Sequence, residues 1–245
     1  MEKVIEDFKI HMESERNLSA HTIKNYLADL RQFKAFLQAN SLLDTQDCLN
    51  QIDNTIIRAF LGSLYRLKIK KVTIARKIAA LRAFFKYLLR EGRIKSDPAC
   101  IIQTPRLEKY IPVFLALDEI NAMLRILEDK KAFVAKERAV IELFYSSGMR
   151  LNELTQLNIE DFDFHSGLVK VRGKGKKERI VPIGAYASNA INAYLKVPDE
   201  KSSDNRSGIK TGPLFVNDQG QRVSSRTIAR IVDRVVKMSG IKRKI

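Results

Sequence analysis

The stretch Tyr145-Ser-Ser-Gly-Met-Arg-Leu-Asn-Glu-Leu-Thr-Gln-Leu157 joins two apolar segments of the chain through a short polar turn. Before the turn, apolar residues recur at helical spacing, and after it leucines recur every third residue. Ser146, Ser147 and Gly148 interrupt this pattern. The stretch therefore predicts two helices with a break between them. A single arginine, Arg150, then lies at the start of the second helix.

Arg150 is an unusual choice for the first turn of a helix. The positive end of the helix dipole disfavours a cation there by a few tenths of a kcal/mol, and stability alone would favour Asp or Glu. Arg150 is therefore a candidate for binding an anion. The alternative is a surface arginine that pairs with Glu153 one turn later, as helix residues at this spacing commonly do.

The composition indicates a globular protein with a polyanionic partner. The 245 residues are 45% hydrophobic, which is enough for one large core or two modest ones. Forty-four Lys and Arg against twenty-eight Asp and Glu give a formal net charge of +16, which favours nucleic acid as the partner. An anionic membrane surface is the competing interpretation. However, no segment approaches the roughly 20 apolar residues of a spanning helix, so we expect no membrane association.

Cysteine usage and the first residues indicate the compartment. Cys48 and Cys100 are far apart, which argues against a disulfide framework or a zinc module and for a reducing cytoplasm. Residues 1–17 are charged throughout, so we expect no signal peptide. We also expect no metal and no cofactor.

The first half of the chain predicts a helical domain over residues 1–102. Four segments carry apolar residues at helical spacing, and Ser19 precedes the second of them as an N-cap. These segments are 4–12, 22–37, 56–65 and 72–90. A polar connection is expected over residues 40–53.

The helix over 72–90 has a predicted cationic side. Its apolar stripe is expected to be buried, whereas Arg76, Lys77 and Arg82 are expected to point away from the core. An α-helix fits the major groove of B-DNA, where such cations reach phosphates and base edges. The alternative is an ordinary solvated helix, since Lys and Arg are good helix formers, and only the net charge of the whole chain weighs against it.

A linker and a mixed domain follow. Residues 103–112 contain two prolines and no apolar period, which predicts a linker to a second domain over residues 113–245. The second domain is predicted to hold helices and one β-hairpin, whose strands are rich in β-branched residues. The helices are expected near 117–127, 137–145, 151–157, 184–196 and 224–238, the strands at 168–172 and 178–183, and an extended segment at 213–216.

The tip of the predicted hairpin is Gly173-Lys-Gly-Lys-Lys177. Two glycines make this tip flexible, and its lysines, Lys174, Lys176 and Lys177, can lie against a nucleic-acid backbone. The pattern is weakly specific, because it lacks the length and the Ser/Thr ending of a nucleotide-binding P-loop. A solvated turn is the alternative.

Four stretches together resemble the tyrosine recombinases of the phage integrase family, most closely the Xer type. Leu18-Ser-Ala-His-Thr-Ile-Lys-Asn-Tyr26 is similar to the opening of the family's core-binding domain, and Ile74-Ala-Arg-Lys-Ile-Ala-Ala-Leu-Arg-Ala-Phe-Phe85 is similar to its DNA-facing helix. Tyr145-Ser-Ser-Gly-Met-Arg-Leu-Asn-Glu-Leu154 resembles the first catalytic box, and Val171-Arg-Gly-Lys-Gly-Lys-Lys-Glu-Arg-Ile-Val-Pro182 resembles the catalytic hairpin. The last two, in this order, are highly specific.

The resemblance implies a fold and an activity. The fold is mainly α with a small β-hairpin or sheet. It comprises a four-helix, SAM-like core-binding domain and a mixed α+β integrase catalytic domain that is incomplete at its C-terminus. The activity is site-specific DNA recombination through a 3′-phosphotyrosyl intermediate, with uses in DNA integration and chromosome segregation. The implied partners are double-stranded DNA and, for the complete protein, a tetrameric synaptic complex with itself or a paralogue.

The resemblance also implies roles for single residues. Arg150 clamps the scissile phosphate, Glu153 supports that site, and Lys174 is the acid for the leaving 5′ oxygen. These residue types suit metal-free phosphoryl transfer, because an arginine fork holds two non-bridging oxygens and a mobile lysine donates a proton. The residues expected to bind DNA are Thr22, Arg76, Lys77, Arg82, Lys176, Lys177 and Arg226.

The sequence departs from the family after the hairpin. A His-x-x-Arg-His box and a tyrosine nucleophile should follow, but all three histidines precede the hairpin and the last tyrosine, Tyr194, comes too early. We therefore assign no nucleophile and expect this chain alone to be inactive. Two functions remain, a recombinase of which this chain is an incomplete piece, or a non-catalytic DNA-binding protein or regulator. Retention of both Arg150 and Lys174 favours the first.

Overall fold

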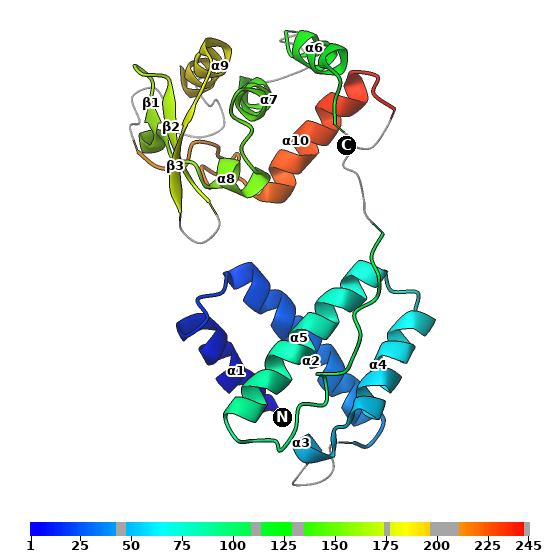
Figure 1. Cartoon of the computed structure of the whole chain (residues 1–245). Coiled ribbons are helices and arrows are strands. Elements are labelled where there is room, and N and C mark those ends of the chain that lie inside the picture. The colour runs from blue at the N-terminus through cyan, green and yellow to red at the C-terminus, as the bar shows by residue number, and fades with distance from the viewer. Residues whose placement is uncertain (43–47, 109–113, 129–134, 174–176, 197–210, 243–245) are drawn as a thin grey trace. The chain divides into compact units, whose positions relative to one another are not determined.

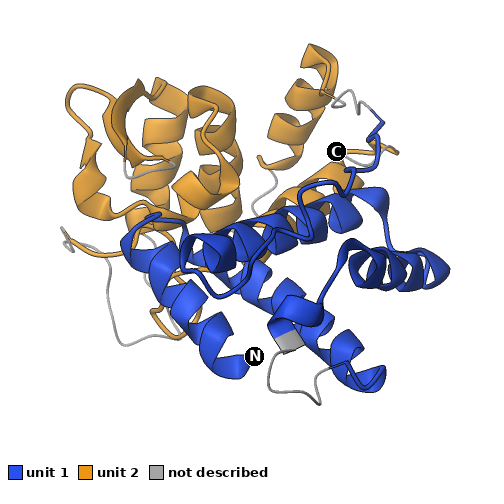
Figure 2. Ribbon diagram, turned by 60° about the horizontal axis from the view of Figure 1, so that its bottom comes forward, with its two compact units in different colours: residues 1–111 blue, residues 112–245 orange. Residues whose placement is uncertain are grey.

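The protein consists of two compact units, residues 1–111 and residues 112–245. The structure is a computed structural model that describes residues 1–42, 48–108, 114–128, 135–173, 177–196 and 211–242. Figure 1 names the elements, and Figure 2 colours the first unit blue and the second orange. Each unit has a hydrophobic core of its own.

Unit 1 is helical, as predicted. Its elements are α1 (Glu2–Ser14), α2 (Ala20–Ala39), α3 (Cys48–Gln51), α4 (Asn54–Arg66) and α5 (Lys71–Arg90). The four predicted amphipathic helices are confirmed as the four long ones. The short α3 lies in the segment that the sequence pattern describes only as a polar connection.

The starts of two helices in unit 1 follow from capping. Ser19 Oγ accepts the Thr22 N–H at 3.2 Å, and Asp53 Oδ1 accepts the Ile56 N–H at 2.9 Å. Each cap satisfies an N–H group that the first turn of a helix leaves without a partner. The prediction that Ser19 caps the second helix is therefore confirmed.

The core of unit 1 is rich in phenylalanine. Phe33 of α2 packs edge-on against Phe60 of α4 with ring centroids 5.1 Å apart. Phe8 of α1 packs edge-on against Phe84 of α5 at 5.4 Å. All four rings are fully buried, and such pairs add to the stabilisation that burial of the rings already gives. One apolar core thus holds the four long helices together.

A buried carboxylate joins α2 to α5. Asp29 of α2 is 2% exposed, its Oδ1 accepts from Lys77 Nζ at 2.7 Å, and its Oδ2 accepts from Arg76. Lys77 is itself only 7% exposed. The expectation that Lys77 points away from the core is therefore wrong. Its ammonium turns inward because a buried carboxylate must be paired with a cation.

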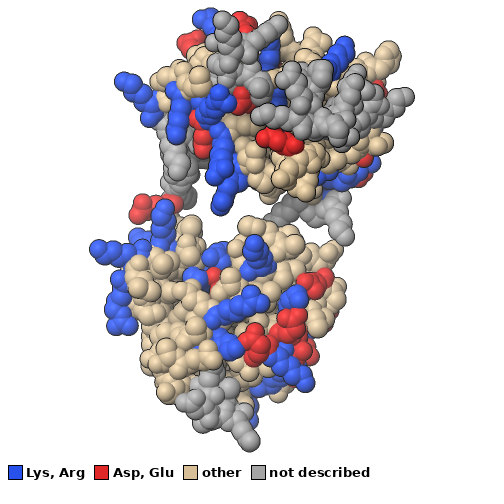
Figure 3. Space-filling model, turned by 180° about the vertical axis from the view of Figure 1, so that it is seen from behind, with Lys and Arg blue, Asp and Glu red and all other residues tan. Residues whose placement is uncertain are grey.

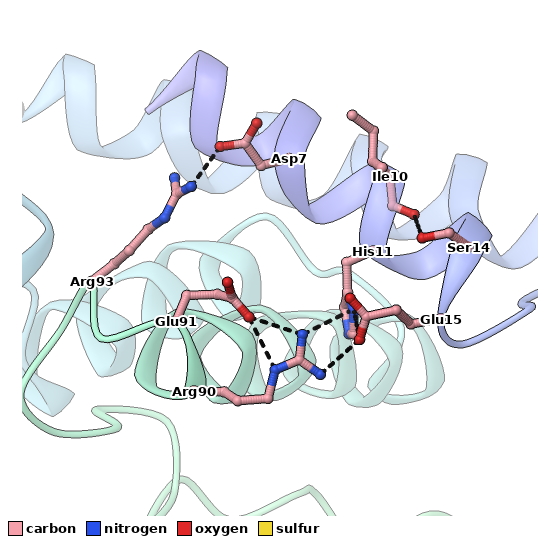
Figure 4. Close-up of polar contacts among 8 residues, drawn as sticks. All are labelled: Asp7, Ile10, His11, Ser14, Glu15, Arg90, Glu91 and Arg93. Atoms are coloured by element: carbon pink, nitrogen blue, oxygen red, sulfur yellow. Dashed lines mark hydrogen bonds and ion pairs between the residues drawn. The ribbon is translucent and has the colours of Figure 1, made fainter.

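A second polar cluster joins the ends of α1 and α5 (Figure 4). The Arg90 guanidinium lies 3.0 Å from a carboxylate oxygen of Glu15 and 3.2 Å from Nδ1 of His11. Arg93, just beyond α5, pairs with Asp7 at 2.7 Å. The side chains of Arg90 and Glu15 are half exposed, so solvent screens this pair and it should add little to stability.

Unit 2 combines helices with a small sheet. Its elements are α6 (Leu117–Ile126), α7 (Ala135–Ser147), α8 (Leu151–Gln156), the 3-10 helix η1 (Ile159–Asp161), β1 (Phe162–Asp163), β2 (Leu168–Arg172), β3 (Glu178–Pro182), α9 (Ala185–Lys196) and α10 (Ser225–Met238). The predicted helices and hairpin are confirmed, and η1 and β1 are additions. No helix in the described parts of either unit is long and apolar enough to cross a membrane.

The strands of unit 2 form an antiparallel sheet in the order β1-β2-β3. Phe162 of β1 faces Val169 of β2, which in turn faces Val181 of β3. After its first residue, β2 alternates buried and exposed residues, as expected for a strand with one covered face. The predicted extended segment at 213–216 forms isolated bridges outside this sheet.

Helix α7 lies at the centre of unit 2. Figure 1 shows it between α9 on one side and α6 and α10 on the other. Ala139, Val140 and Leu143 of α7 are fully buried. The buried carboxylate of Glu137, near the start of α7, accepts from Arg234 of α10 at 2.6 Å. These contacts therefore fix the position of α7 and of the turn that follows it.

The buried carboxylate of unit 1 leads to a first prediction. Asp29→Ala should lower the free energy of unfolding by about 3 kcal/mol, because it leaves the Lys77 ammonium buried without its counter-charge. Glu6→Ala, which removes the exposed Glu6–Lys9 pair on α1, should change the free energy of unfolding far less, because solvent screens that pair. Urea unfolding followed by circular dichroism measures both. Equal, small losses for the two variants would contradict the structural role assigned to Asp29.

Candidate functional site

The turn between α7 and α8 presents Arg150. Gly148 adopts a left-handed conformation with φ of 60°, and its N–H donates to the Phe144 carbonyl at 2.9 Å, which closes the end of α7. Met149 is buried and anchors the turn in the core. Arg150 then occupies the N-cap position of α8, so the helix begins one residue after it. We expected Arg150 within the first turn of the helix, and the structure places it one residue before that turn.

Arg150 pairs with Glu153 and still exposes its guanidinium. The Arg150 N–H donates to Glu153 Oε2 at 2.8 Å, and Nη1 donates to Oε1 at 3.1 Å. The arginine side chain nevertheless remains 78% exposed. The two interpretations of Arg150 are therefore compatible. The pairing with Glu153 is present, and most of the guanidinium stays accessible to an anion.

Glu153 is the buried centre of the site. Its side chain is 5% exposed, and Arg179 of β3 binds both of its oxygens, Nη1 to Oε1 at 2.9 Å and Nη2 to Oε2 at 2.8 Å. The hydrogen bonds from Arg179, and then those from Arg150, lower the pKa of Glu153 to about 2, although its burial acts in the opposite direction. The carboxylate is therefore ionised at neutral pH and holds two arginines at once.

The hairpin tip begins against the same carboxylate. A Cβ atom on Gly173 would lie 3.4 Å from both Glu153 Oε1 and Arg179 Nη1. The Gly173 N–H donates to the Lys177 carbonyl at 2.7 Å and closes the base of the tip. The backbone at Gly173 is thus held beside the carboxylate that also holds Arg150.

The other predicted residues of unit 2 lie on the hairpin tip and on α10. Lys174 and Lys176 fall outside the described residues, and Lys177 is exposed at the base of the tip. Arg226 is exposed in the first turn of α10. That turn is tied to α8 by a 2.8 Å hydrogen bond from Ser225 to a residue of α8. Arg226 therefore lies on the helix next to the one that Arg150 caps.

The remaining predicted DNA-binding residues belong to unit 1, and most of them make internal contacts. Thr22 lies in the first turn of α2, partly buried. Arg76 pairs with Asp29, and Arg82 donates to the Ile102 carbonyl. These arginines are therefore not free side chains on a solvated helix face. Figure 3 shows Lys and Arg side chains on the surface of both units.

Two arginines that hold these elements in place were not predicted from the sequence. Arg179 faces Val171 across the hairpin, and Val171 is fully buried, so strand alternation places Arg179 on the core side of β3. That alternation was the available signal. Arg222 donates to the carbonyls of Thr155 and Leu157 at 2.9 Å each and so holds the end of α8. Arg222 lies in a loop, where no periodic pattern indicates its contacts.

The arrangement suits the binding of a phosphate group. An exposed guanidinium binds two phosphate oxygens at once, and a buried carboxylate behind it fixes its orientation. Within the described residues, no group of three or more His, Cys, Asp or Glu is placed to hold a metal ion. The exposed Arg150 guanidinium, held by Glu153, offers the stabilisation of negative charge by a cation.

Glu153 leads to a second prediction. Glu153→Gln should lower the free energy of unfolding by about 2 kcal/mol at neutral pH, because the single oxygen of an amide cannot accept the four hydrogen bonds that Arg150 and Arg179 donate to the carboxylate. The pKa of Glu153 is depressed from 4.5 to about 2, so its contribution is complete above the unfolded-state pKa and is lost as the pH falls through that interval. The difference between wild type and variant should shrink on acidification, as measured by urea unfolding at a series of pH values.

The matched control for this prediction is Glu178→Gln. Glu178 lies on the same hairpin and pairs with Lys170 and Arg172, but its side chain is 47% exposed. This substitution should change stability little. A wild-type advantage over Glu153→Gln that stays constant down to about pH 2 would contradict the assignment of the ionised carboxylate.

Comparison with protein families places both units. The model described as "Phage integrase, N-terminal SAM-like domain" matches residues 5–92, and the model described as "Phage integrase family" matches residues 113–245. The tyrosine recombinase XerC of Syntrophus aciditrophicus is 49% identical over 249 residues, which cover 100% of this chain and 80% of that protein. The XerC of Thermodesulfovibrio yellowstonii is 37% identical, over 98% of this chain and 77% of that protein.

Solved structures show the same fold. A lambda integrase dimer bound to a COC′ core site superposes with a TM-score of 0.71 at 18% identity, covering 100% of this chain and 65% of that one. The XerH recombinase in a post-cleavage complex with a palindromic difH substrate gives a TM-score of 0.69 at 23% identity, covering 98% and 69%. Together with the two family matches, these likenesses lead to one conclusion: the chain belongs to the phage integrase family of tyrosine recombinases.

Proposed function

We propose that this protein acts in site-specific DNA recombination, and that the site around Arg150 binds the scissile phosphate. The observation that carries the proposal is the arrangement of Arg150, Glu153 and Gly173. An exposed guanidinium is fixed by a buried carboxylate, and the backbone leading to the tip lysine lies against that carboxylate. The XerC relatives, identical at up to 49% of positions, support the same assignment.

The proposed roles follow from the chemistry of phosphoryl transfer. Arg150 binds the non-bridging oxygens of the scissile phosphate, where negative charge gathers in the transition state. Glu153 touches no substrate and orients Arg150. Lys174, one residue beyond Gly173, donates the proton that the leaving 5′ oxygen requires, because an alkoxide is a poor leaving group without one.

The proposed partner is double-stranded DNA, held by both units. The helical domain over 1–102 and the catalytic domain over 113–245 contact the duplex, and residues 103–112 join them as a linker. Thr22, Arg76 and Arg82 would contribute from the first domain. Lys176, Lys177 and Arg226 would contribute from the second, together with the tip lysine. The lambda integrase tetramer bound to a Holliday junction supports a tetramer of this protein, or of this protein and a paralogue, on DNA.

DNA binding gives a third prediction. Affinity for duplex DNA should fall steeply with salt, because each neutralised phosphate releases counterions. Arg150→Ala should weaken binding by about tenfold, the loss of one charged hydrogen-bonded contact. Arg138→Ala on α7, whose side chain is 39% exposed and lies 3.9 Å from Glu142, removes the same charge and should change affinity far less. Fluorescence anisotropy with a duplex selected by this protein from random sequence measures the salt dependence and the affinities of both variants.

A salt-independent affinity would reject the electrostatic mode of binding. Equal effects of the two alanine substitutions would reject the special role of Arg150. Lys77→Ala is unsuitable as a test of direct contact, since Lys77 is buried against Asp29 and its loss would disturb the fold.

The finer proposal is that residues 1–245 bind DNA without cutting it. Strand cleavage needs a hydroxyl in line with the leaving oxygen, and cations do not replace such a nucleophile. Tyr194 is 8% exposed and its hydroxyl accepts from the Val216 N–H at 3.3 Å, so it is poorly placed to attack a phosphate. Among the described tyrosines of unit 2, Tyr145 and Tyr186 are exposed and are the candidates that a test must cover.

This proposal gives a fourth prediction. A nicked suicide duplex carrying the selected site should yield no covalent protein–DNA adduct with the 245-residue chain on a denaturing gel. The XerC of Syntrophus aciditrophicus, tested on its own site, serves as the positive control. An adduct with this chain would refute the finer proposal, and its loss in Tyr145→Phe or Tyr186→Phe would identify the nucleophile.

A further inference from the structure

We infer that Arg179 is a positioning residue of the phosphate-binding site and acts through Glu153 on Arg150. The inference rests on the proposed function of Arg150 as the phosphate clamp. Arg179 lies on strand β3, and we infer that it fixes the orientation of Arg150, which lies 29 positions earlier in the chain on a different element.

The geometry of the carboxylate carries the inference. Each oxygen of Glu153 accepts one hydrogen bond from Arg150 and one from Arg179: Oε1 from both Nη1 atoms at 3.1 and 2.9 Å, and Oε2 from the Arg150 backbone N–H and Arg179 Nη2, both at 2.8 Å. Arg179 thus fixes the plane of the carboxylate by holding both oxygens at once. The direction in which Oε1 meets Arg150 follows from that plane.

Without Arg179, the plane of the carboxylate would be held less firmly. A glutamate carboxylate rotates readily about its last side-chain bond, and both remaining donors would come from Arg150, the backbone N–H to Oε2 and the exposed side-chain Nη1 to Oε1. Burial keeps the carboxylate at 5% exposed, where solvent cannot compensate for a missing donor. The guanidinium of Arg150, 78% exposed and held to the protein by Nη1, would then sample more orientations.

The guanidinium of Arg179 also borders the base of the hairpin tip. The Cβ position of Gly173 lies 3.4 Å from Arg179 Nη1 and 3.4 Å from Glu153 Oε1. Arg179 therefore contacts Glu153, which holds Arg150, and also lies beside Gly173, where the hairpin tip begins. Only an arginine suits this place, because a lysine ammonium is a single point charge and cannot hold two carboxylate oxygens in a fork.

The test measures the affinity of the 245-residue chain for the selected duplex. Arg179→Gln and Arg150→Gln should each weaken binding by about tenfold, and the double variant should bind no more weakly than Arg150→Gln alone. Such non-additivity is expected if Arg179 acts only through Arg150. Arg179→Lys keeps the charge but loses the fork, so it should resemble Arg179→Gln and should not restore affinity.

The matched control is Arg172→Gln. Arg172 lies on the neighbouring strand of the same hairpin, is half exposed, and pairs with Glu178 and Asp161 instead of Glu153. Its substitution removes an equal charge from the hairpin, and in combination with Arg150→Gln its effect should multiply. Thermal unfolding of every variant shows whether it is folded at the temperature of the binding assay.

The outcomes separate this inference from the function on which it rests. If Arg150→Gln does not weaken binding, the proposed function of Arg150 fails. If Arg150→Gln weakens binding but Arg179→Gln multiplies its effect, or Arg179→Lys restores affinity, then Arg179 contacts DNA by its charge and the inference is overturned. A folded Arg179→Lys variant with a lowered melting temperature and wild-type affinity would assign Arg179 a purely structural role and would also overturn it.

Discussion

The site of this protein depends on one buried carboxylate that must be ionised. Burial of Glu153 is unfavourable for its charge, and the hydrogen bonds from two arginines reverse that balance strongly enough to hold its pKa at about 2. Because the arginines come from an N-cap and from a strand, the requirement for neutralisation draws α8 and the hairpin together. The geometry of this site therefore follows from the need to neutralise a buried charge.

Unit 1 also contains a buried carboxylate that is neutralised by cations, and there it joins two helices. Asp29 is buried between α2 and α5 and is neutralised by Arg76 and Lys77, so the packing of two helices depends on charges that composition alone assigns to the surface. Glu137 and Arg234 repeat the arrangement between α7 and α10. The count of forty-four Lys and Arg therefore overstates the cations that lie free at the surface, because several of them are engaged in ion pairs within the protein.

The sequence predicted what depends on near neighbours and missed what depends on distant partners. Helical periodicity identified the long helices, and the Gly-rich segment between β-branched runs identified the hairpin, because each signal lies within a few residues. Lys77 lies three residues after the buried Ile74, which is a core-facing spacing, but a lysine is buried only with a partner, and Asp29 is 48 positions away. The pairing of Arg179 with Glu153, 26 positions apart, was missed for the same reason.

Strand β3 ends the described sheet, since β2 is its only partner within it. Such a free edge can recruit the strand of another molecule and start aggregation. Here its charged residues Glu178 and Arg179 are held by salt bridges, and Pro182 has no N–H to offer an incoming strand. Ile180, 68% exposed, is the apolar exception. Charged side chains and a proline are features that disfavour the addition of a strand at such an edge, so we expect β3 to resist self-association despite its open side.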